Sequence, residues 1–237
     1  MTPDETLVLD DPAAAVAERL ADAAAAGRHI ALTGGSTPRT AYERAAALGA
    51  DWSRATIWFG DDRCVPPDHE HSNFGMAKRA LLDRLAAPPA AIHRIEGELG
   101  PEAGAAAYER TLREAFPETL PELDLLLLGI GPDAHCASLF PRAPALAEKD
   151  RRAVGVNTPG MAPFVARVSL TLPVLNAARE VIFLAAGEDK AAAVRRAFAG
   201  RPDPDAPASL VSPATGSLTV VLDAAAASSL PDPTGTR

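Results

Sequence analysis

A histidine in a glycine-rich segment is the strongest candidate for a catalytic group in this sequence. His135 lies in the run GIGPDAHCASLFP, residues 129–141, and Asp133 precedes it by two positions. An imidazole can take a proton from water near neutral pH, and a neighbouring carboxylate can orient the ring. A lone histidine is more often structural, so this segment alone leaves both interpretations open.

Two nucleophiles close to this histidine do not fit known arrangements. Cys136 is adjacent to it, but adjacency in sequence does not make a catalytic dyad. Ser138 lacks the Gly-x-Ser-x-Gly turn of esterases. We therefore expect activated water, rather than a side chain, to be the attacking group.

A second polar group is the sequence Asp61-Asp62-Arg63, which follows an apolar run. Its guanidinium could hold a phosphate or carboxylate, and Asp61 could orient a base. A structural ion pair is the alternative. Nearby, His69 and His71 form a His-x-His pattern that by itself is a weak metal signal, and we expect no metal site.

The turn formed by Gly34, Gly35, Ser36 and Thr37, followed by Pro38, combines flexible backbone with two hydroxyl groups at the start of a predicted helix. Free N–H groups at such a position suit an anion, so the turn is a candidate phosphate cradle. The alternative is an ordinary turn in which Thr37 caps the helix. It is not a Walker loop, since the final Gly-Lys-Ser/Thr is missing.

Two more cations belong to the candidate site. Lys190 follows Gly187-Glu188-Asp189 at the predicted end of a strand, and Arg167 lies in another segment expected to reach the same place. Either could instead be an ordinary surface charge.

The elements that must position these residues alternate between strand and helix. Helices are predicted over residues 12–26, up to 48 after the glycine turn, after Ser72, up to about Gly200, and in the Ala-rich C-terminal stretch. Strands are predicted over residues 29–33, 55–59, 123–128, 181–186 and 218–222. This alternation predicts an α/β fold with an open, mostly parallel, doubly wound sheet and helices on both faces.

Four polar or glycine-rich segments begin directly after predicted strands, at Gly34, Gly60, Gly129 and Gly187. Ligands of open parallel sheets bind beyond the carboxyl ends of the strands. We therefore expect the four segments to converge on one site.

Composition limits the class of protein. The 237 residues are 47% apolar and 23% charged, which suits one globular domain over residues 1–230 with a disordered tail at 231–237. The net charge of −8 argues against nucleic-acid binding, although a local cationic cluster can still bind a small anion. No signal peptide or membrane span is recognisable, and Cys64 and Cys136 are too few for a disulfide framework, so a cytoplasmic location is expected.

Five ordered motifs together resemble the bacterial 6-phosphogluconolactonases, within the wider glucosamine-6-phosphate isomerase/deaminase group. The likeness covers nearly the whole chain and is carried by LTGGSTP (32–38), GDDRCVP (60–66) with HSN (71–73), the run 129–141, RVSLTLP (167–173) and GEDK (187–190).

The resemblance implies an enzyme that hydrolyses 6-phospho-D-glucono-1,5-lactone to 6-phosphogluconate without a metal or cofactor. It implies that His135 is the general base, with Asp133 or Asp61 orienting it. The phosphate would be held by Gly35, Ser36 and Thr37, with cationic contacts from Arg63, Arg167 and Lys190. The expected partner is the phosphorylated sugar lactone alone, and the expected state is a monomer or small homo-oligomer.

One position departs from the family pattern, because similar sequences usually have glycine where this chain has Ala134. If the backbone there needs a positive φ, alanine costs about 1 kcal/mol and shifts the neighbouring histidine.

Two rival functions remain. A glucosamine-6-phosphate deaminase typically has Phe-Asn-Glu-Pro where this chain has Ser138-Leu139-Phe140-Pro141. The other rival is a non-catalytic sugar-phosphate sensor, which would usually carry a DNA-binding or regulatory segment that we do not recognise here.

Overall fold

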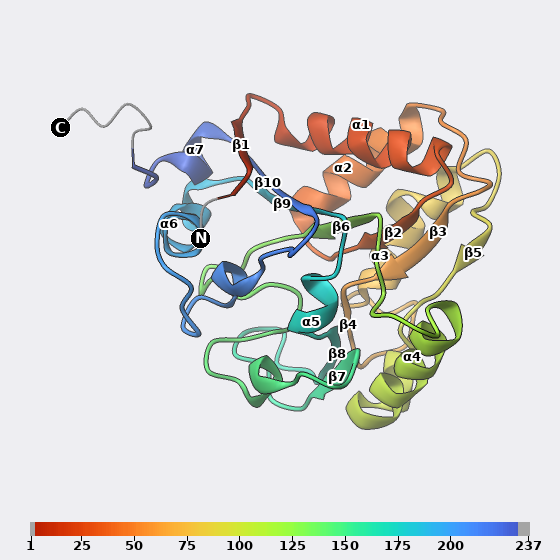
Figure 1. Ribbon diagram of the computed structural model, residues 1–237. Helices are drawn as coiled ribbons and strands as arrows, with labels where there is room; N and C mark the ends of the chain where they lie inside the picture. Colours follow the sequence, from red (N-terminus) through yellow and green to blue (C-terminus); the bar gives the residue numbers. More distant parts are fainter. Residues whose placement is uncertain (1–2, 232–237) are drawn as a thin grey trace.

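The computed structural model describes residues 3–231, and its main feature is a seven-stranded sheet in which every pair of neighbours is parallel (Figure 1). The strands lie in the order β1 (Glu5–Val8), β10 (Ser217–Leu222), β9 (Glu180–Ala185), β6 (Leu125–Leu128), β2 (His29–Leu32), β3 (Thr56–Phe59) and β5 (Ala91–Ile92). The predicted parallel α/β sheet is confirmed.

The strand order reverses direction between β2 and β6. From β2 the chain proceeds outward to β3 and β5, and from β6 it proceeds the other way to β9 and β10. Such a reversal leaves a crevice at the carboxyl ends of the two central strands. The glycine turn at Gly34 follows β2, and the segment with His135 follows β6, so both open onto this crevice.

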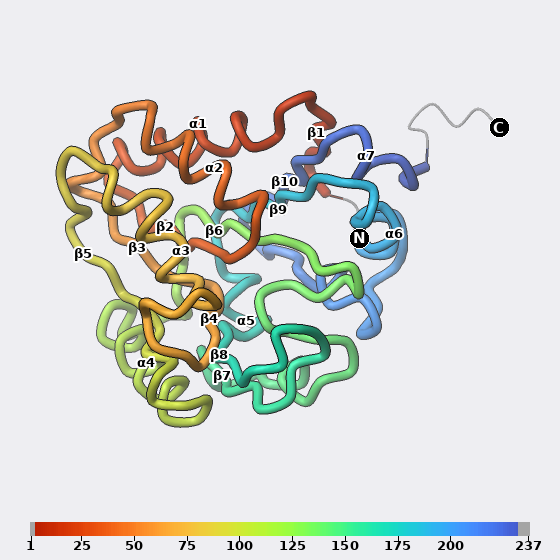
Figure 2. Tube along the Cα trace, turned by 180° about the vertical axis from the view of Figure 1, so that it is seen from behind, coloured from red at the N-terminus to blue at the C-terminus, as the bar shows by residue number. Residues whose placement is uncertain are grey.

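Helices cover the sheet on both sides. Helices α1 (Pro12–Ala25) and α2 (Ser36–Ala47) lie on one side, and α4 (Pro101–Ala115) and α5 (Leu172–Leu175) lie on the other in both views (Figures 1 and 2). The remaining helices are α3 (Asn73–Ala80), α6 (Ala191–Phe198) and α7 (Ala224–Ala227). As predicted, α1 starts after Asp11, whose carboxylate accepts a hydrogen bond from the Ala14 N–H at 3.2 Å.

Both central strands are fixed by buried groups. All four leucines of β6 are buried, as the continuous apolar run predicted. Tyr42 of α2 donates its hydroxyl to the Thr33 carbonyl and accepts from the Thr33 N–H, each at 2.8 Å. These bonds hold the end of β2 against α2 just where the glycine turn begins.

A second, three-stranded antiparallel sheet lies below the first and was not predicted. Its strands are β4 (Asp61–Arg63), β8 (Arg167–Leu170) and β7 (Ala153–Val156). Gly60 joins the two sheets, because its N–H donates to Leu32 of the large sheet and its carbonyl accepts from Leu170 of the small one. Strands β1 and β5 and helix α4 were also not predicted.

The charged sequence of β4 explains why no strand was predicted there. Three residues are too few to show the alternation of a strand, and the partner strand that completes the pairing comes much later in the chain.

The sequence predicted a disordered C-terminal tail and no membrane span. Residues 232–237 of the predicted tail lie outside the described residues. Within residues 3–231, no helix combines the length and apolarity needed to cross a bilayer.

Ala134 has a left-handed backbone conformation, the case considered above because similar sequences usually have glycine at this position. Its φ is 67°, and the residue is fully buried. Its N–H donates to the Gly131 carbonyl at 2.8 Å, and its carbonyl accepts from the Ala208 N–H at 2.9 Å. Because both sides of the residue are fixed, the strain cannot be relieved by a small rotation.

Replacing this alanine by glycine tests the strain. Ala134→Gly loses a buried methyl group, worth about 0.8 kcal/mol, but removes a conformational cost of about 1 kcal/mol. Ala45→Gly, at an equally buried position in helix α2, loses the methyl and about 1 kcal/mol of helix propensity. Urea unfolding measures the free energy of unfolding of each variant. We expect Ala134→Gly to lower it by at least about 1 kcal/mol less than Ala45→Gly does. Equal losses would show that the left-handed conformation is not strained.

Candidate active site

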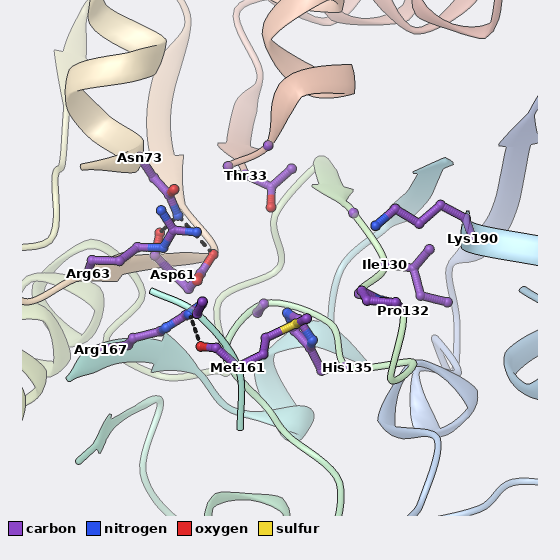
Figure 3. Close-up of a pocket in the computed structure, with 16 residues that line it drawn as sticks. Thr33, Asp61, Arg63, Asn73, Ile130, Pro132, His135, Met161, Arg167 and Lys190 are labelled. Carbon is purple, nitrogen blue, oxygen red and sulfur yellow. Dashed lines mark hydrogen bonds between the residues drawn. The ribbon is translucent and has the colours of Figure 1, made fainter. Parts of the chain in front are cut away.

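A cleft of about 260 Å³ opens beyond the carboxyl ends of β2 and β6 (Figure 3). Four strand-following segments contribute to its lining, so the predicted convergence is seen in the structure. They supply Gly34 and Gly35 after β2, Asp61 and Arg63 after β3, residues 129–132 with His135 after β6, and Lys190 after β9. Arg167, Met161 and Ala162 complete the wall near the small sheet.

His135 and Asp133 form a short pair at the base of this cleft. Nδ1 of the imidazole lies 2.6 Å from Oδ1 of Asp133, and the same oxygen accepts the His135 N–H at 3.1 Å. Burial raises the pKa of Asp133, but the hydrogen bonds and charge of His135 outweigh it and lower the pKa below its usual value. The carboxylate is therefore ionised and holds Nδ1, which leaves Nε2 as the ring nitrogen available for proton transfer.

Gly131 allows this pair to form. A Cβ at that position would lie 2.1 Å from Nδ1 of His135 and 2.7 Å from Oδ1 of Asp133. Its N–H donates to the His135 carbonyl at 3.0 Å, which closes the turn. Only glycine fits, and the Gly-x-Gly pattern before the histidine was the sequence signal for it.

Asp61 lines the same cleft but contacts other groups. Its Oδ2 accepts the Ser138 hydroxyl at 2.7 Å, and its Oδ1 accepts the Asn73 amide at 3.2 Å. The hydrogen-bond partner of the imidazole is thus Asp133, and Asp61 connects the start of α3 to the segment that carries His135.

Asp62 points to the other side of β4, as alternation along a strand requires. Its carboxylate accepts the N–H groups of Asn73 and Phe74 and the Ser72 hydroxyl at the start of α3. Burial raises the pKa of Asp62 to about 6, against the hydrogen bonds from the N–H groups of Phe74, Asn73 and Arg63, which lower it. Asp62 therefore positions α3, and with it Asn73, rather than facing the cleft.

The two arginines of the site are direct neighbours on adjacent strands. Arg63 and Arg167 are register partners of the antiparallel strands β4 and β8, a placement that is unfavourable for like charges. Arg63 donates to the His71 carbonyl at 2.8 Å, and Arg167 donates to the carbonyls of Met161 and Pro163 at 3.1 and 3.2 Å.

Neither arginine forms an ion pair with a carboxylate within the described part of the chain. The Nε atoms of Arg63 and Arg167 are both buried without a hydrogen-bond partner. Burial is also the largest effect on the pKa of Arg167 and lowers it. Unpaired donors and two adjacent positive charges are features that suit the binding of an anion.

Lys190 lies on the opposite side of the cleft from the arginines (Figure 3). Its ammonium is 3.2 Å from Asp189, and its side chain is 24% exposed. The predicted cations therefore occupy two walls, and the imidazole lies between them in this view.

The glycine turn is only partly as predicted. Helix α2 begins at Ser36, its N-cap is Gly35 with φ of 116°, and no side chain caps it, so the interpretation of Thr37 as a cap is wrong. Gly34 and Gly35 line the cleft, Ser36 lines an adjoining hollow, and Thr37 lines neither of them.

The cleft is also lined by residues that were not predicted as functional, among them Asn73, Thr33 and Met161. Asn73 packs so closely on Gly34 that a Cβ there would lie 2.0 Å from its Oδ1. Asn73 and Thr33 belong to the motifs HSN and LTGGSTP that carry the family resemblance, but no role was predicted for either, and Met161 gave no chemical signal. In the described residues, no group of three or more potential ligands gathers around His69 and His71 to hold a metal.

Comparisons with known proteins agree on one family. The model of the family described as glucosamine-6-phosphate isomerases/6-phosphogluconolactonase matches residues 3–220. A 6-phosphogluconolactonase of Streptomyces coelicolor is 40% identical over 96% of this chain and 92% of its own length. One from Homo sapiens is 42% identical over 90% of this chain and 85% of its own length.

Solved structures give the same result. The 6-phosphogluconolactonase of Trypanosoma brucei superposes with a TM-score of 0.83 at 26% identity, covering 98% of this chain and 100% of its own. With the family model matching nearly the whole sequence, the chain belongs to the glucosamine-6-phosphate isomerase/6-phosphogluconolactonase family.

Proposed function

We propose that this protein hydrolyses 6-phospho-D-glucono-1,5-lactone to 6-phosphogluconate, using water activated by His135. The observation that carries the proposal is the pairing of His135 with Asp133 in a cleft whose other walls hold three cations. The names of relatives at 40% and 42% identity support the choice of substrate.

In the proposed reaction, Nε2 of His135 takes a proton as water attacks the lactone carbonyl carbon. Asp133 stabilises the imidazolium that forms, because its ionised carboxylate already accepts from Nδ1. The carbon–ring oxygen bond then breaks, and the imidazolium returns the proton to that oxygen. One water is consumed, a hydroxyl and a carboxylic acid are formed, and the histidine is regenerated.

The cations and the glycine turn position the substrate. In our proposal Gly34, Gly35 and Ser36, which line the cleft or the hollow beside it, hold the phosphate, and Arg63, Arg167 and Lys190 supply cationic contacts. Arg63 or backbone N–H groups stabilise the oxyanion that develops on the carbonyl. Since the phosphate is remote from the carbonyl, its binding fixes the geometry of attack.

The deaminase alternative lacks a residue here. The chain has Leu139 and Phe140 where deaminases typically have Asn and Glu, so the second carboxylate of that chemistry is missing. Phe140 instead packs its ring 4.6 Å from the ring of His135.

The proposed activity is tested by coupling freshly generated lactone to 6-phosphogluconate dehydrogenase and, in parallel, by measuring ammonia release from glucosamine 6-phosphate. We expect product from the lactone above its spontaneous hydrolysis, and a fall in kcat of about 10²- to 10⁴-fold for His135→Ala. His69→Gln, at an exposed histidine outside the cleft, should retain the activity. Ammonia release without lactone turnover would reverse the proposal, and an unchanged rate in His135→Ala would refute the base.

Two glycines of the catalytic segment provide a test of imidazole placement. Gly131→Ala forces a methyl group against Nδ1 of His135, whereas a Cβ at Gly129 would meet its nearest neighbour at 3.9 Å. We expect Gly131→Ala to lower kcat by at least about 100-fold, since small misplacement of a catalytic group is costly. Gly129→Ala should keep most of the activity, with circular dichroism showing both variants folded. Full activity in Gly131→Ala would mean that the pair with Asp133 is not needed.

A further inference from the structure

A groove between helices α2 and α3 adjoins the cleft. The two helices pack against each other, and their traces can be followed in Figure 2. It consists of two hollows. The first shares Arg63 and Asn73 with the cleft, and the second shares Arg39 and Glu70 with the first. Because neighbouring hollows share lining residues, we treat them as one path, the α2–α3 groove.

Helix periodicity explains which side chains line this groove. Ser36, Arg39 and Glu43 are spaced by three and four residues and so share a face of α2. Met76 and Arg79 are spaced by three and share the facing side of α3. The groove is therefore a consequence of two helices whose facing stripes each contain an arginine.

Arginines outnumber carboxylates in the groove, which is lined by Arg39, Arg63, Arg79 and Arg84 together with Glu43 and Glu70. Arg39 and Arg79 form no ion pair among the described residues, and Arg84 reaches Glu43 only at 3.9 Å. Some exposed arginines elsewhere are closely paired, such as Arg44 with Asp11 at 2.6 Å. Glu70 is the remaining acidic residue of the groove, and it is exposed.

The groove is positive, whereas the whole chain has a net negative charge. The net charge is −8, so the chain as a whole repels a phosphorylated substrate. A groove of one sign concentrates the field, and such focusing raises association rates by about 10- to 1000-fold. The groove ends at Arg63, one of the two arginines with an unpaired buried Nε.

We propose that the α2–α3 groove captures the phosphorylated substrate and guides it to the cleft. Arg39 and Arg79 supply the attraction, and Glu70 weakens it. This inference rests on the proposed function, because it concerns how that substrate arrives. The ligand is recognised by its phosphate charge, so an uncharged lactone gains nothing from the groove.

The test compares kcat/KM of the whole protein at about 0.01 M and about 1 M ionic strength, where the Debye length is about 30 Å and 3 Å. In Arg39→Ala/Arg79→Ala we expect a loss of about tenfold at low salt that shrinks below about twofold at high salt. Glu70→Gln should have the opposite effect, a gain of about twofold at low salt.

Two controls distinguish loss of capture by the groove from a change in the total charge of the protein and from misfolding. Arg28→Ala removes an exposed, unpaired arginine just before β2, at the opposite end of that strand from the cleft, and should leave the salt dependence unchanged. Unphosphorylated gluconolactone, assayed at high enzyme concentration, should be hydrolysed equally by the double variant and the parent protein.

Several outcomes would overturn the proposal that the α2–α3 groove captures the substrate. They are a salt dependence in the double variant equal to that of the parent protein, an equal loss in Arg28→Ala, or a loss that persists at 1 M ionic strength. Absence of lactone turnover in the parent protein at every salt concentration would instead refute the proposed function, so the two failures are distinguishable.

Discussion

The buried carboxylate of Asp61 is the contact on which the geometry of the cleft depends. It joins strand β4 to the Asn73 amide at the start of α3 and to the Ser138 hydroxyl in the segment that carries His135. Hydrogen bonds to a charged group contribute about 1.5–3 kcal/mol each, and a buried charge left without them is strongly destabilising. This one side chain therefore contacts the small sheet, the helix and the catalytic segment, and it helps to fix them relative to one another.

The same carboxylate makes the adjacent arginines tolerable. Arg63 and Arg167 face each other across β4 and β8, and the charge of Asp61 opposes the pKa lowering of Arg167. One negative charge does not balance two positive ones, and both Nε atoms remain unpaired. Adjacent like charges and unpaired buried donors reduce stability, a cost that proteins commonly bear at functional sites.

The elements that the sequence predicted correctly are those whose signal is local. The leucine run of β6, the capped start of α1 and the glycine turn after β2 each depend on neighbours in sequence, and parallel topology then brings their ends together. His135, Asp133 and the cations followed from that convergence and from the family resemblance.

What the sequence did not show depends on distant partners. Strand β4 is charged and short, and it is a strand only because β8 pairs with it. Likewise Asn73 enters the cleft because Asp62 and Asp61 hold it there, and Met161 because Arg167 holds its carbonyl. No periodicity within a single segment carries such information.

The join at Gly60 constrains how this protein can change. Its N–H bonds to one sheet and its carbonyl to the other. Gly60 is therefore the single residue that connects β3 to β4, and both of its backbone groups are fixed. Side chains alternate along β4, with Asp61 and Arg63 facing the cleft and Asp62 facing α3. A single inserted residue at this point would exchange the two faces, turning the guanidinium toward the helix and a bare carboxylate toward the substrate. Homologues that vary in length should therefore do so elsewhere in the chain.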